Sequence, residues 1–366
     1  MRVLILINSI SGLFCFREKL IQTLAENNCD VCAVVPISSG NDAETEEKLR
    51  QIGCNVLHTA LDRRGINPIR DAKLFFDYLK ILRRQRPELV ITYTVKPNIY
   101  GGWACRLMKI PYAANITGIG TAFQSDGLLK TLVTLMQRTA LRKAKVVFFE
   151  NSGNRQTFVD LKIVPIDKTH VLNGAGVDLE KFSIAPYPTD SGETRFLFIG
   201  RVMKEKGIDE LLAAMRLLIK DGEKCSLDVV GGYEEDYSRQ FTQAEEEGWL
   251  RYHGSQMDVR PFIAASHCFV LPSWHEGMAN TNLECAASCR PVITSNIHGC
   301  LEAVEDGVSG FLCESKNAED LYRTMKRFMA LSDTERETMG LNGRKRMEEV
   351  FDKKKVVEET ISLILS

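Results

Sequence analysis

The feature of this sequence that most constrains its fold is a regular alternation of short apolar runs with segments of helical periodicity. The runs are apolar throughout, as strands covered by helices on both faces should be. In the first series the expected strands are 3–7, 31–36, 56–59, 89–93, 112–116 and 146–149, and the expected helices are 14–25, 43–51, 69–84 and 98–108. Such alternation predicts an α/β domain built on a parallel sheet with right-handed crossovers.

A second series of the same kind follows a break at 173–188, where turn-forming Asn, Gly and Pro residues predict a linker. Its expected strands are 196–199, 227–230, 268–271 and 291–294, and its expected helices are 208–220, 237–247, 281–287 and 301–304. The most economical architecture is two Rossmann-like parallel-sheet domains that face a central cleft, with ligands bound at the carboxyl ends of the strands. The length of 366 residues also favours two domains.

Composition is that of an ordinary globular protein, with 44% hydrophobic and 26% charged residues. Residues 1–188 carry 25 Lys and Arg against 17 Asp and Glu. This basic first half leaves three interpretations open: a nucleic-acid surface, an anionic membrane surface, or unevenly spread surface charge. The eleven cysteines lack zinc-like spacing and predict buried thiols.

No run approaches the ~20 apolar residues of a membrane span. The N-terminal apolar run is also shorter than the ~7–15-residue core of a signal peptide. We therefore expect a cytoplasmic protein, which can still lie at the cytoplasmic face of the inner membrane. The stretch 128–145 interleaves apolar and basic positions, as an interfacial amphipathic helix does; a core-facing apolar stripe with a solvated basic face is the alternative.

Three segments can carry chemistry. The first expected strand leads into Gly12 without a G-x-G-x-x-G motif, so it predicts either a phosphate-approaching backbone or an ordinary tight turn. After the strand at 196–199, Gly200, Arg201 and Lys206 precede a helix, and such cations at a helix N-terminus favour a diphosphate; a solvated basic loop is the alternative.

The third segment is the stretch from Glu276 to Glu284, which follows the buried run 268–271. Glu276 is expected on the strand-to-helix loop, where a carboxylate can accept hydrogen bonds from sugar hydroxyls. Glu284 is expected about one turn inside the helix, where it can bind a ribose diol. The backbone of 277–280 is expected to present N–H groups near the helix start. Two glutamates eight apart are common, so this spacing alone does not define a site. No His, Asp and Glu set has metal-ligand spacing.

Together these residues resemble the retaining glycosyltransferases of family 4, which have the two-domain GT-B fold. The specific marks are Gly200-Arg201 with Lys206-Gly207, and the E-x7-E pattern of Glu276 and Glu284. The stretches 290–293 and 306–312 add to them. Two further stretches, 115–123 and 173–178, are similar to a bacterial branch of N-acetylgalactosaminyltransferases that act on undecaprenyl-diphosphate-linked sugars.

The resemblance implies a role for each matching residue. Arg201 and Lys206 would stabilise the charge on the leaving nucleotide, and Glu276 would contact the donor sugar; these three form the expected catalytic set. Glu284 would bind the ribose. The other expected donor contacts are Gly12, Gly200, Met257, Gly277, Met278, Ala279 and Asn280. No metal and no cofactor are expected besides the nucleotide-sugar donor. The terminal helix at about 351–366 would join 1–173 in an acceptor-binding domain, and 174–350 would bind the donor.

The chain departs from the family pattern at three places. Many members carry a histidine on the loop that here contains Thr117 and Gly118; with Asn115, these residues are the expected acceptor or sugar loop. Ala279 stands where proline is common, and Cys289 stands where glycine is common, which we interpret as a packing change.

The expected function is retaining, metal-independent transfer of a hexose or N-acetylhexosamine from a UDP-sugar to a glycan acceptor. The acceptor is expected to be polyprenyl-diphosphate-linked, as in bacterial capsule or lipopolysaccharide assembly, with possible contact with the inner membrane and no nucleic acid. The alternatives are a sugar-nucleotide epimerase of the same architecture and a catalytically silent scaffold.

Overall fold

The computed structural model describes residues 1–37, 42–61, 67–120, 123, 127–189 and 192–365. The chain forms two compact units, one of Met1–Ala175 with Lys354–Ser366 and the other of Gly176–Lys353. The boundary expected at 173/174 lies close to the observed one. The assignment of acceptor and donor to the two units stays a prediction.

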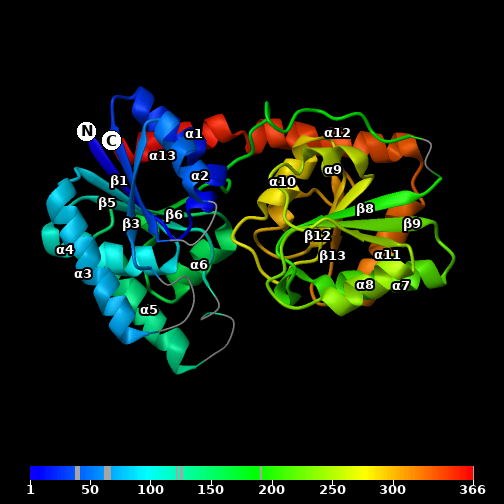
Figure 1. The fold of residues 1–366 in the computed structure, drawn as a ribbon, viewed down its shortest axis with the longest axis horizontal. Coiled ribbons are helices and arrows are strands. Elements are labelled where there is room, and N and C mark those ends of the chain that lie inside the picture. Colours follow the sequence, from blue (N-terminus) through cyan, green and yellow to red (C-terminus); the bar gives the residue numbers. More distant parts are fainter. Residues whose placement is uncertain (38–41, 62–66, 121–122, 124–126, 190–191, 366) are drawn as a thin grey trace. The chain divides into compact units, whose positions relative to one another are not determined.

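Unit 1 contains a seven-stranded parallel sheet of order β3-β2-β1-β4-β5-β6-β7 (Figure 1). Its strands are β1 (Arg2–Leu6), β2 (Asp30–Pro36), β3 (Cys54–Thr59), β4 (Leu89–Tyr93), β5 (Tyr112–Ile116), β6 (Val146–Phe149) and β7 (Thr169–Val171). Its helices are α1 (Ile10–Glu26), α2 (Asp42–Gln51), α3 (Pro68–Gln85), α4 (Gly102–Met108), α5 (Leu128–Leu141), α6 (Ser152–Asp160) and α13 (Lys353–Leu365), with the π-helix η1 (Pro97–Gly101) and the 3₁₀ turn η3 (Ile166–Lys168).

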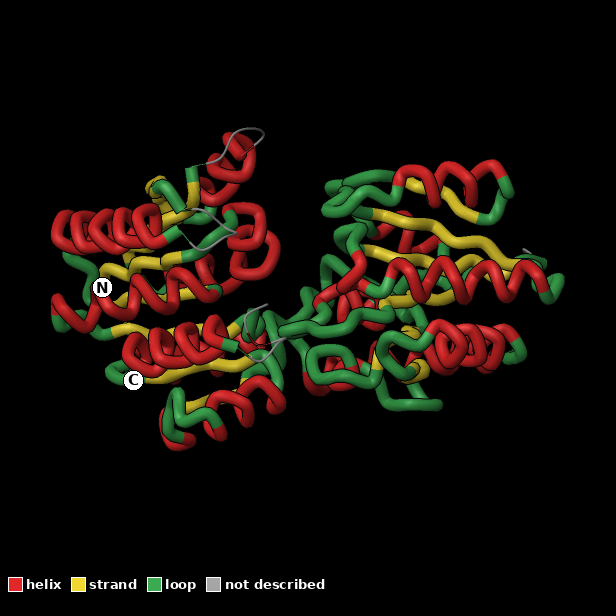
Figure 2. The backbone as a smooth tube through the Cα atoms, turned by 90° about the horizontal axis from the view of Figure 1, so that it is seen from below, coloured by secondary structure: helices red, strands yellow, loops and turns green. Residues whose placement is uncertain are grey.

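Helices cover both faces of the sheet of unit 1 (Figure 2). Its strands are apolar on both sides, so each face is buried in a core. In β1, Leu4 and Leu6 belong to a core with α3, α4 and α5, whereas Val3 and Ile5 belong to a core with α1 and α13. Successive side chains of a strand point to opposite faces, so one apolar run supplies two cores. This confirms the parallel sheet expected from continuous apolar runs.

Unit 2 contains a six-stranded parallel sheet of order β10-β9-β8-β11-β12-β13. Its strands are β8 (Thr194–Ile199), β9 (Cys225–Val230), β10 (Leu250–Tyr252), β11 (Cys268–Leu271), β12 (Val292–Ser295) and β13 (Gly310–Cys313). Its helices are α7 (Ile208–Lys220), α8 (Ser238–Glu246), α9 (Arg260–Ala265), α10 (Asn280–Ala287), α11 (Ala318–Met329) and α12 (Asp333–Val350), with the 3₁₀ turns η4 (Lys204–Lys206) and η5 (Leu301–Ala303).

Three predicted helices differ from the observed ones. The helix expected at 301–304 is the single 3₁₀ turn η5, and the helix expected at 98–108 begins with the π-helix η1 before it becomes α4. The helix expected from residue 14 begins four residues earlier, at Ile10, because the Ser9 side chain caps it by accepting a hydrogen bond from the Gly12 amide at 3.1 Å. Gly12 therefore lies in the first turn of α1 and not in a loop before it.

The linker expected at 173–188 is wrong for most of its length, because the segment packs onto unit 2. Phe182 and Tyr187 are buried. The guanidinium of Arg290, itself fully buried, donates to the carbonyls of Ala185 and Pro186 at 3.0 and 2.6 Å. The turn-rich composition correctly predicted irregular backbone. It could not predict that the buried Arg290 side chain would hydrogen-bond to this backbone.

Candidate functional site

Most of the predicted donor residues of unit 2 follow two neighbouring strands of its sheet. Strands β8 and β11 are neighbours, and the sheet extends from β8 toward β9 on one side and from β11 toward β12 on the other. Ligands of open α/β sheets bind at such a switch point, outside the carboxyl ends of the strands. Arg201 and Lys206 follow β8, and Glu276 and Glu284 follow β11. The order of strands thus brings together residues far apart in sequence.

The centre of this site is an ion pair between Lys206 and Glu276. The Lys206 ammonium donates to Oε1 of Glu276, and the Ser273 hydroxyl donates to the same oxygen at 2.8 Å. The two charged side chains are only 19% and 11% exposed. Both bonds end on Oε1, and neither uses Oε2. The pair places a cation and a hydrogen-bond acceptor side by side, as binding of a sugar phosphate requires.

A glycine allows the two loops of the site to meet. Gly207 follows Lys206 with φ of +76°, and a Cβ atom added to it would lie 2.1 Å from the carbonyl oxygen of Pro272. This left-handed backbone and this close approach both exclude a larger residue. Gly207 thereby holds Lys206 against the loop that carries Glu276.

Arg201 occupies a different environment from Lys206. Its side chain is 51% exposed, and its guanidinium pairs with Glu234 at 3.3 Å rather than with Glu276. Gly200, the residue before it, is held at the end of β8. Its amide donates a hydrogen bond to the Val230 carbonyl, and a Cβ atom added to Gly231 would lie 1.8 Å from the Gly200 carbonyl oxygen. Of the two predicted cations, Lys206 is the one that is already held at the Glu276 carboxylate.

The backbone that follows Glu276 is partly engaged within the protein. The Ala279 amide donates to the Gly299 carbonyl at 2.7 Å, and the Asn280 amide donates to Met278 at 3.0 Å. The side chains of Met278 and Ala279 are buried. Free N–H groups at Ala279 and Asn280, which the sequence predicted, are therefore not present in this conformation, and ligand contact through them needs the loop to shift.

Two residues that sequence reasoning missed support this loop. Gly299 has φ of +92°, and a Cβ on it would lie 2.7 Å from the Glu276 carbonyl oxygen. Glu302 accepts a 2.6 Å hydrogen bond from the Gly299 amide and binds the His298 ring at 2.9 Å. The His-Gly-x-x-Glu spacing after β12 was the available signal. These contacts fix the backbone against which Glu276 rests.

Glu284 lies one turn inside α10, as predicted, and is partly buried. Burial raises its pKa to about 7, although the nearby Lys353 and Lys181 act in the opposite direction. A carboxylate held in such a poorly hydrated position has a strong need for hydrogen-bond donors. Met257, the residue expected near the base, lies on a loop and is 89% exposed.

The site residues predicted on unit 1 lie at the carboxyl ends of its strands. A Cβ at Gly12 would meet the Ser9 side chain at 3.4 Å, an ordinary contact, so unit 1 by itself has room for a larger residue there. Asn115, the residue before the last of β5, is buried. Thr117 and Gly118 follow it and are partly exposed. Thr121 and Ala122, which belong to the same sequence stretch, lie outside the described residues.

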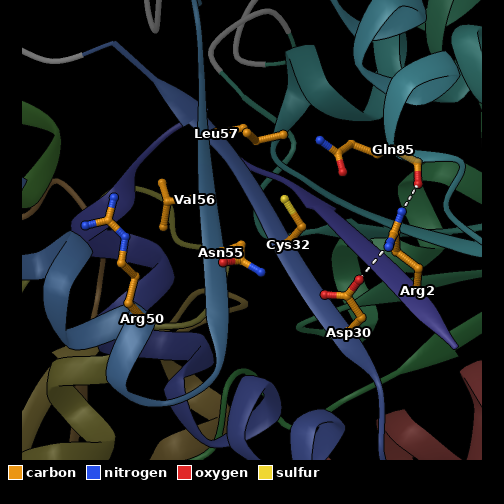
Figure 3. A pocket seen from close by; sticks show the side chains of 8 residues that line it. All are labelled: Arg2, Asp30, Cys32, Arg50, Asn55, Val56, Leu57 and Gln85. Atoms are coloured by element: carbon orange, nitrogen blue, oxygen red, sulfur yellow. Dashed lines mark hydrogen bonds and ion pairs between the residues drawn. The ribbon is translucent and has the colours of Figure 1, made fainter.

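The cavity in Figure 3, of about 380 Å³, does not lie at the carboxyl ends of the strands. It is lined at the amino ends of β1, β2 and β3, where Arg2 bonds Asp30 at 2.7 Å and the Gln85 carbonyl at 2.6 Å. Burial raises the pKa of the Cys32 thiol to about 11, which makes it a poor nucleophile. The position and the chemistry both separate this cavity from the predicted site.

Other motif residues have structural roles. Cys289 adopts φ of +59°, so glycine would suit this position because of its backbone and not, as we expected, because of packing. The Asp306 side chain accepts from the Leu312 amide at 2.9 Å and shapes the turn before β13. Ten of the eleven cysteines are buried thiols. Within the described ranges, no three His, Cys, Asp or Glu side chains form a group that could hold a metal ion.

Comparison with known proteins identifies the class of this fold and site. The family model "Glycosyl transferases group 1" matches residues 180–346, and "Glycosyl transferase 4-like domain" matches 16–174. Both models describe glycosyltransferases and together they match most of the chain, which is an enzyme of the hexosyltransferase class. The family resemblance expected from the sequence is confirmed.

Two known glycosyltransferases are similar to this chain over most of its length. The chain is 26% identical over 337 residues to N,N'-diacetylbacillosaminyl-diphospho-undecaprenol alpha-1,3-N-acetylgalactosaminyltransferase of Campylobacter jejuni, with 88% of this chain and 87% of the relative covered. It is 24% identical over 359 residues to the capsular polysaccharide biosynthesis glycosyltransferase CapM of Staphylococcus aureus, with 94% and 91% covered.

Solved structures share the fold over the whole chain. Anabaena HepE, crystallised with UDP and glucose, has a TM-score of 0.80 at 17% identity, with 99% of this chain and 98% of that chain covered. Sucrose-phosphate synthase from Thermosynechococcus elongatus has a TM-score of 0.78 at 18% identity, with 99% and 98% covered. These likenesses confirm the GT-B fold.

Proposed function

We propose that the chain transfers a hexose or N-acetylhexosamine from a UDP-sugar to a sugar carried on polyprenyl diphosphate. The observation that carries the proposal is the Lys206–Glu276 pair at the switch point of unit 2. The Campylobacter relative is named for an undecaprenyl-diphosphate-linked acceptor, and HepE was crystallised with UDP and glucose. These names support the acceptor and the donor, respectively, and the CapM relative supports a place in capsule or lipopolysaccharide assembly.

In the proposed reaction the bond between the sugar C1 and the diphosphate breaks, and the acceptor oxygen bonds C1 on the same face. The leaving diphosphate takes the proton of the acceptor hydroxyl. Lys206, joined by Arg201, stabilises the negative charge that develops on the diphosphate. Glu276 orients the donor sugar through its hydroxyls, and Glu284 accepts hydrogen bonds from the ribose. These roles need no metal ion, because fixed cations supply the charge.

We also propose that unit 1 lies against the cytoplasmic face of the inner membrane through α5. Leu128, Leu132 and Leu135 are 91%, 50% and 53% exposed, and basic residues follow at the end of the helix. Exposed leucines with flanking cations suit an interface with anionic lipid. Among the described helices, none is long and apolar enough to cross a membrane.

The test is a transfer assay with UDP-N-acetylgalactosamine, UDP-galactose and UDP-glucose and a panel of short polyprenyl-diphosphate-linked sugars. We expect acceptor-dependent release of UDP, an α-anomeric product from the α-linked donor, and an unchanged rate in the presence of a chelator. Calorimetry with UDP-, GDP- and ADP-sugars identifies the nucleotide. A chain that binds none of them is not a transferase of this kind, and a β-linked product would rule out retention.

A further inference from the structure

The segment after β4 combines two rare backbone features. Thr94 has φ of +70°, in the left-handed region that a β-branched residue seldom adopts. Three residues later the chain enters the π-helix η1, a rare form that occurs mostly as short insertions within α-helices and is frequent at functional sites. Strained backbone of this kind persists where the surrounding structure enforces it, and it gathers at ligand sites.

This segment occupies the switch point of unit 1. Strand β1 lies next to β4, and the sheet extends from β1 toward β2 on one side and from β4 toward β5 on the other. The loop after β4 therefore corresponds in unit 1 to the loop of Glu276 in unit 2, which follows β11. The same rule that places the donor site in unit 2 predicts a ligand at this loop.

A half-buried cation lies at this point. The Lys96 ammonium pairs with Oδ1 of Asp71 at 2.7 Å, and the two side chains are only 16% and 9% exposed. Asp71 belongs to the first turn of α3, and the Tyr100 side chain lies close enough for the Asp71 carboxylate to raise the pKa of its hydroxyl. The Thr94 hydroxyl is buried and has no hydrogen-bond partner within the described part of the chain. A charge held this far from water is costly unless it is paired.

A buried polar network holds the segment in place. The Thr92 hydroxyl donates to Asn98 at 2.6 Å, and the Asn98 amide donates to the Asn115 carbonyl at 2.9 Å. A Cβ at Gly120, whose φ is +81°, would lie 3.2 Å from the Val95 side chain. The loop of Lys96 therefore packs beside the loop that follows Asn115, where the sequence predicted contact with the acceptor.

We propose that Lys96, together with the Thr94 hydroxyl, binds the diphosphate of the acceptor. The ammonium exchanges Asp71 for phosphate oxygens, which a compact cation with three donors suits well. Asp71 then serves as the group that keeps Lys96 in position when no phosphate is bound. The inference rests on the proposed function, since it names the residue that recognises the lipid-linked acceptor.

The experiment compares Lys96→Met with Lys96→Arg and with Lys80→Met, a control at an exposed lysine of α3. Transfer is measured to a polyprenyl-diphosphate-linked sugar and to the same sugar on a neutral alkyl chain. Lys96→Met is expected to raise KM for the diphosphate acceptor about 10- to 100-fold. The KM for the UDP-sugar and the rate with the neutral acceptor are expected to stay within about twofold, and Lys96→Arg restores most of the affinity.

Asp71→Asn separates binding from a purely structural ion pair. If Lys96 binds the acceptor, this variant keeps the ammonium and removes the carboxylate that competes for it, so KM for the diphosphate acceptor is expected not to show the about 10- to 100-fold rise of Lys96→Met. If the pair only ties α3 to the loop, Lys96→Met and Asp71→Asn lower the melting temperature alike and slow transfer to both acceptors. That result overturns the proposal, and so does a rise in KM for the UDP-sugar instead of the acceptor.

Direct binding distinguishes failure of this inference from failure of the proposed function. Farnesyl diphosphate serves as the probe, and its Kd is measured by calorimetry with no donor present. Weaker binding to Lys96→Met than to the unaltered chain supports the inference even if no transfer is found with any acceptor. Equal binding to both proteins overturns it, whatever the transfer assay shows.

Discussion

Lys206 and Glu276 form an ion pair although they lie 70 residues apart in the sequence, and each side chain is more than four-fifths buried. Removing either one leaves its partner poorly hydrated and unpaired. We expect Lys206→Ala to lower kcat/KM by about 10²- to 10³-fold and the free energy of unfolding by about 1–3 kcal/mol. Lys204→Ala, in the same 3₁₀ turn, is the matched control, because Lys204 is exposed. Steady-state kinetics and thermal denaturation measure the two effects.

The double variant Lys206→Met with Glu276→Gln separates these effects. It leaves no unpaired charge, so we expect it to regain stability without regaining activity. Recovery of transfer in the double variant would show that the pair is structural and that neither side chain acts on the donor.

Glu284 gives the site a pH dependence with a definite sign. Burial raises its pKa to about 7, so the folded chain holds this proton more tightly than the unfolded chain does. In the proposed role, ionised Glu284 accepts hydrogen bonds from both ribose hydroxyls. We therefore expect UDP-sugar affinity to rise with pH and to level off above about 7. Below that value the loss approaches tenfold per pH unit.

Calorimetry of a UDP-sugar from about pH 5.5 to about pH 8.5, a span that extends to both sides of the Glu284 pKa, checks this expectation. A UDP-sugar is preferable to UDP because its diphosphate does not titrate in that range. In Glu284→Gln the dependence is expected to vanish. For stability the sign is opposite, because the raised pKa contributes stability at low pH that is lost as pH rises toward 7. A Kd that weakens with rising pH contradicts the ribose role.

At the scale of single elements, the sequence predicted most of those that bury a continuous apolar run, although β13, which is also buried, was not predicted as a strand. The four-residue strands β6 and β11 were predicted correctly because every residue in them is apolar. The three-residue strands β7 and β10 carry polar residues and gave no such signal. Helix α12 was not predicted for another reason, which is that it packs through glycine and has no apolar stripe. A Cβ atom added to Gly340 would lie only 2.1 Å from the Cys289 carbonyl oxygen.

The candidate site was predicted less completely than the sheets. The loop motifs located Glu276, Glu284 and the cations correctly on the elements that carry them. The partner of each charge could not be predicted, because Lys206–Glu276 and Arg201–Glu234 join segments that only tertiary packing brings together. The strained Thr94 gave no sequence signal, since nothing in its neighbours requires a left-handed residue.

Helix α5 carries the exposed leucine side chains through which we propose that unit 1 contacts the membrane. We expect Leu132→Gln with Leu135→Gln to abolish sedimentation with vesicles that contain about one-third anionic lipid, because partition depends on buried apolar area. Transfer to a water-soluble acceptor should stay within about twofold, since neither side chain contributes to the core of unit 1. Leu341→Gln, on α12 and 49% exposed, is the control. Unchanged sedimentation of the double variant would exclude α5 as the contact.

At the scale of the whole molecule, the chain passes between the units twice, and the two crossings lie side by side. The Val177 amide donates to Phe351 at 2.8 Å, and the Lys353 amide donates to Val177 at 3.1 Å. A Cβ at Gly176 would lie 2.6 Å from the Lys353 Cα, so only glycine fits. The paired crossings explain why α13, which follows the last helix of unit 2, belongs to unit 1.

Deletion of 354–366 tests what α13 contributes. The helix buries Val356, Val357 and Ile364 in the core that also contains Val3 and Ile5. Each buried side chain is worth about 1.5–3 kcal/mol, and a domain has only about 5–15 kcal/mol in total. We therefore expect the melting transition of unit 1 to fall steeply or disappear.

Unit 2 contains its own sheet and core, so its transition should persist in the truncated chain and should still rise with added UDP-sugar. Calorimetry resolves the two transitions, and the assay should show donor binding without transfer to the lipid-linked acceptor. Every expected donor residue except Gly12 belongs to unit 2. Loss of UDP-sugar binding in the truncated chain would therefore mean that unit 2 depends on unit 1 for its fold or for the Gly12 contact. Full transfer activity without α13, together with an unchanged melting transition of unit 1, would mean that the helix adds nothing to the stability of unit 1.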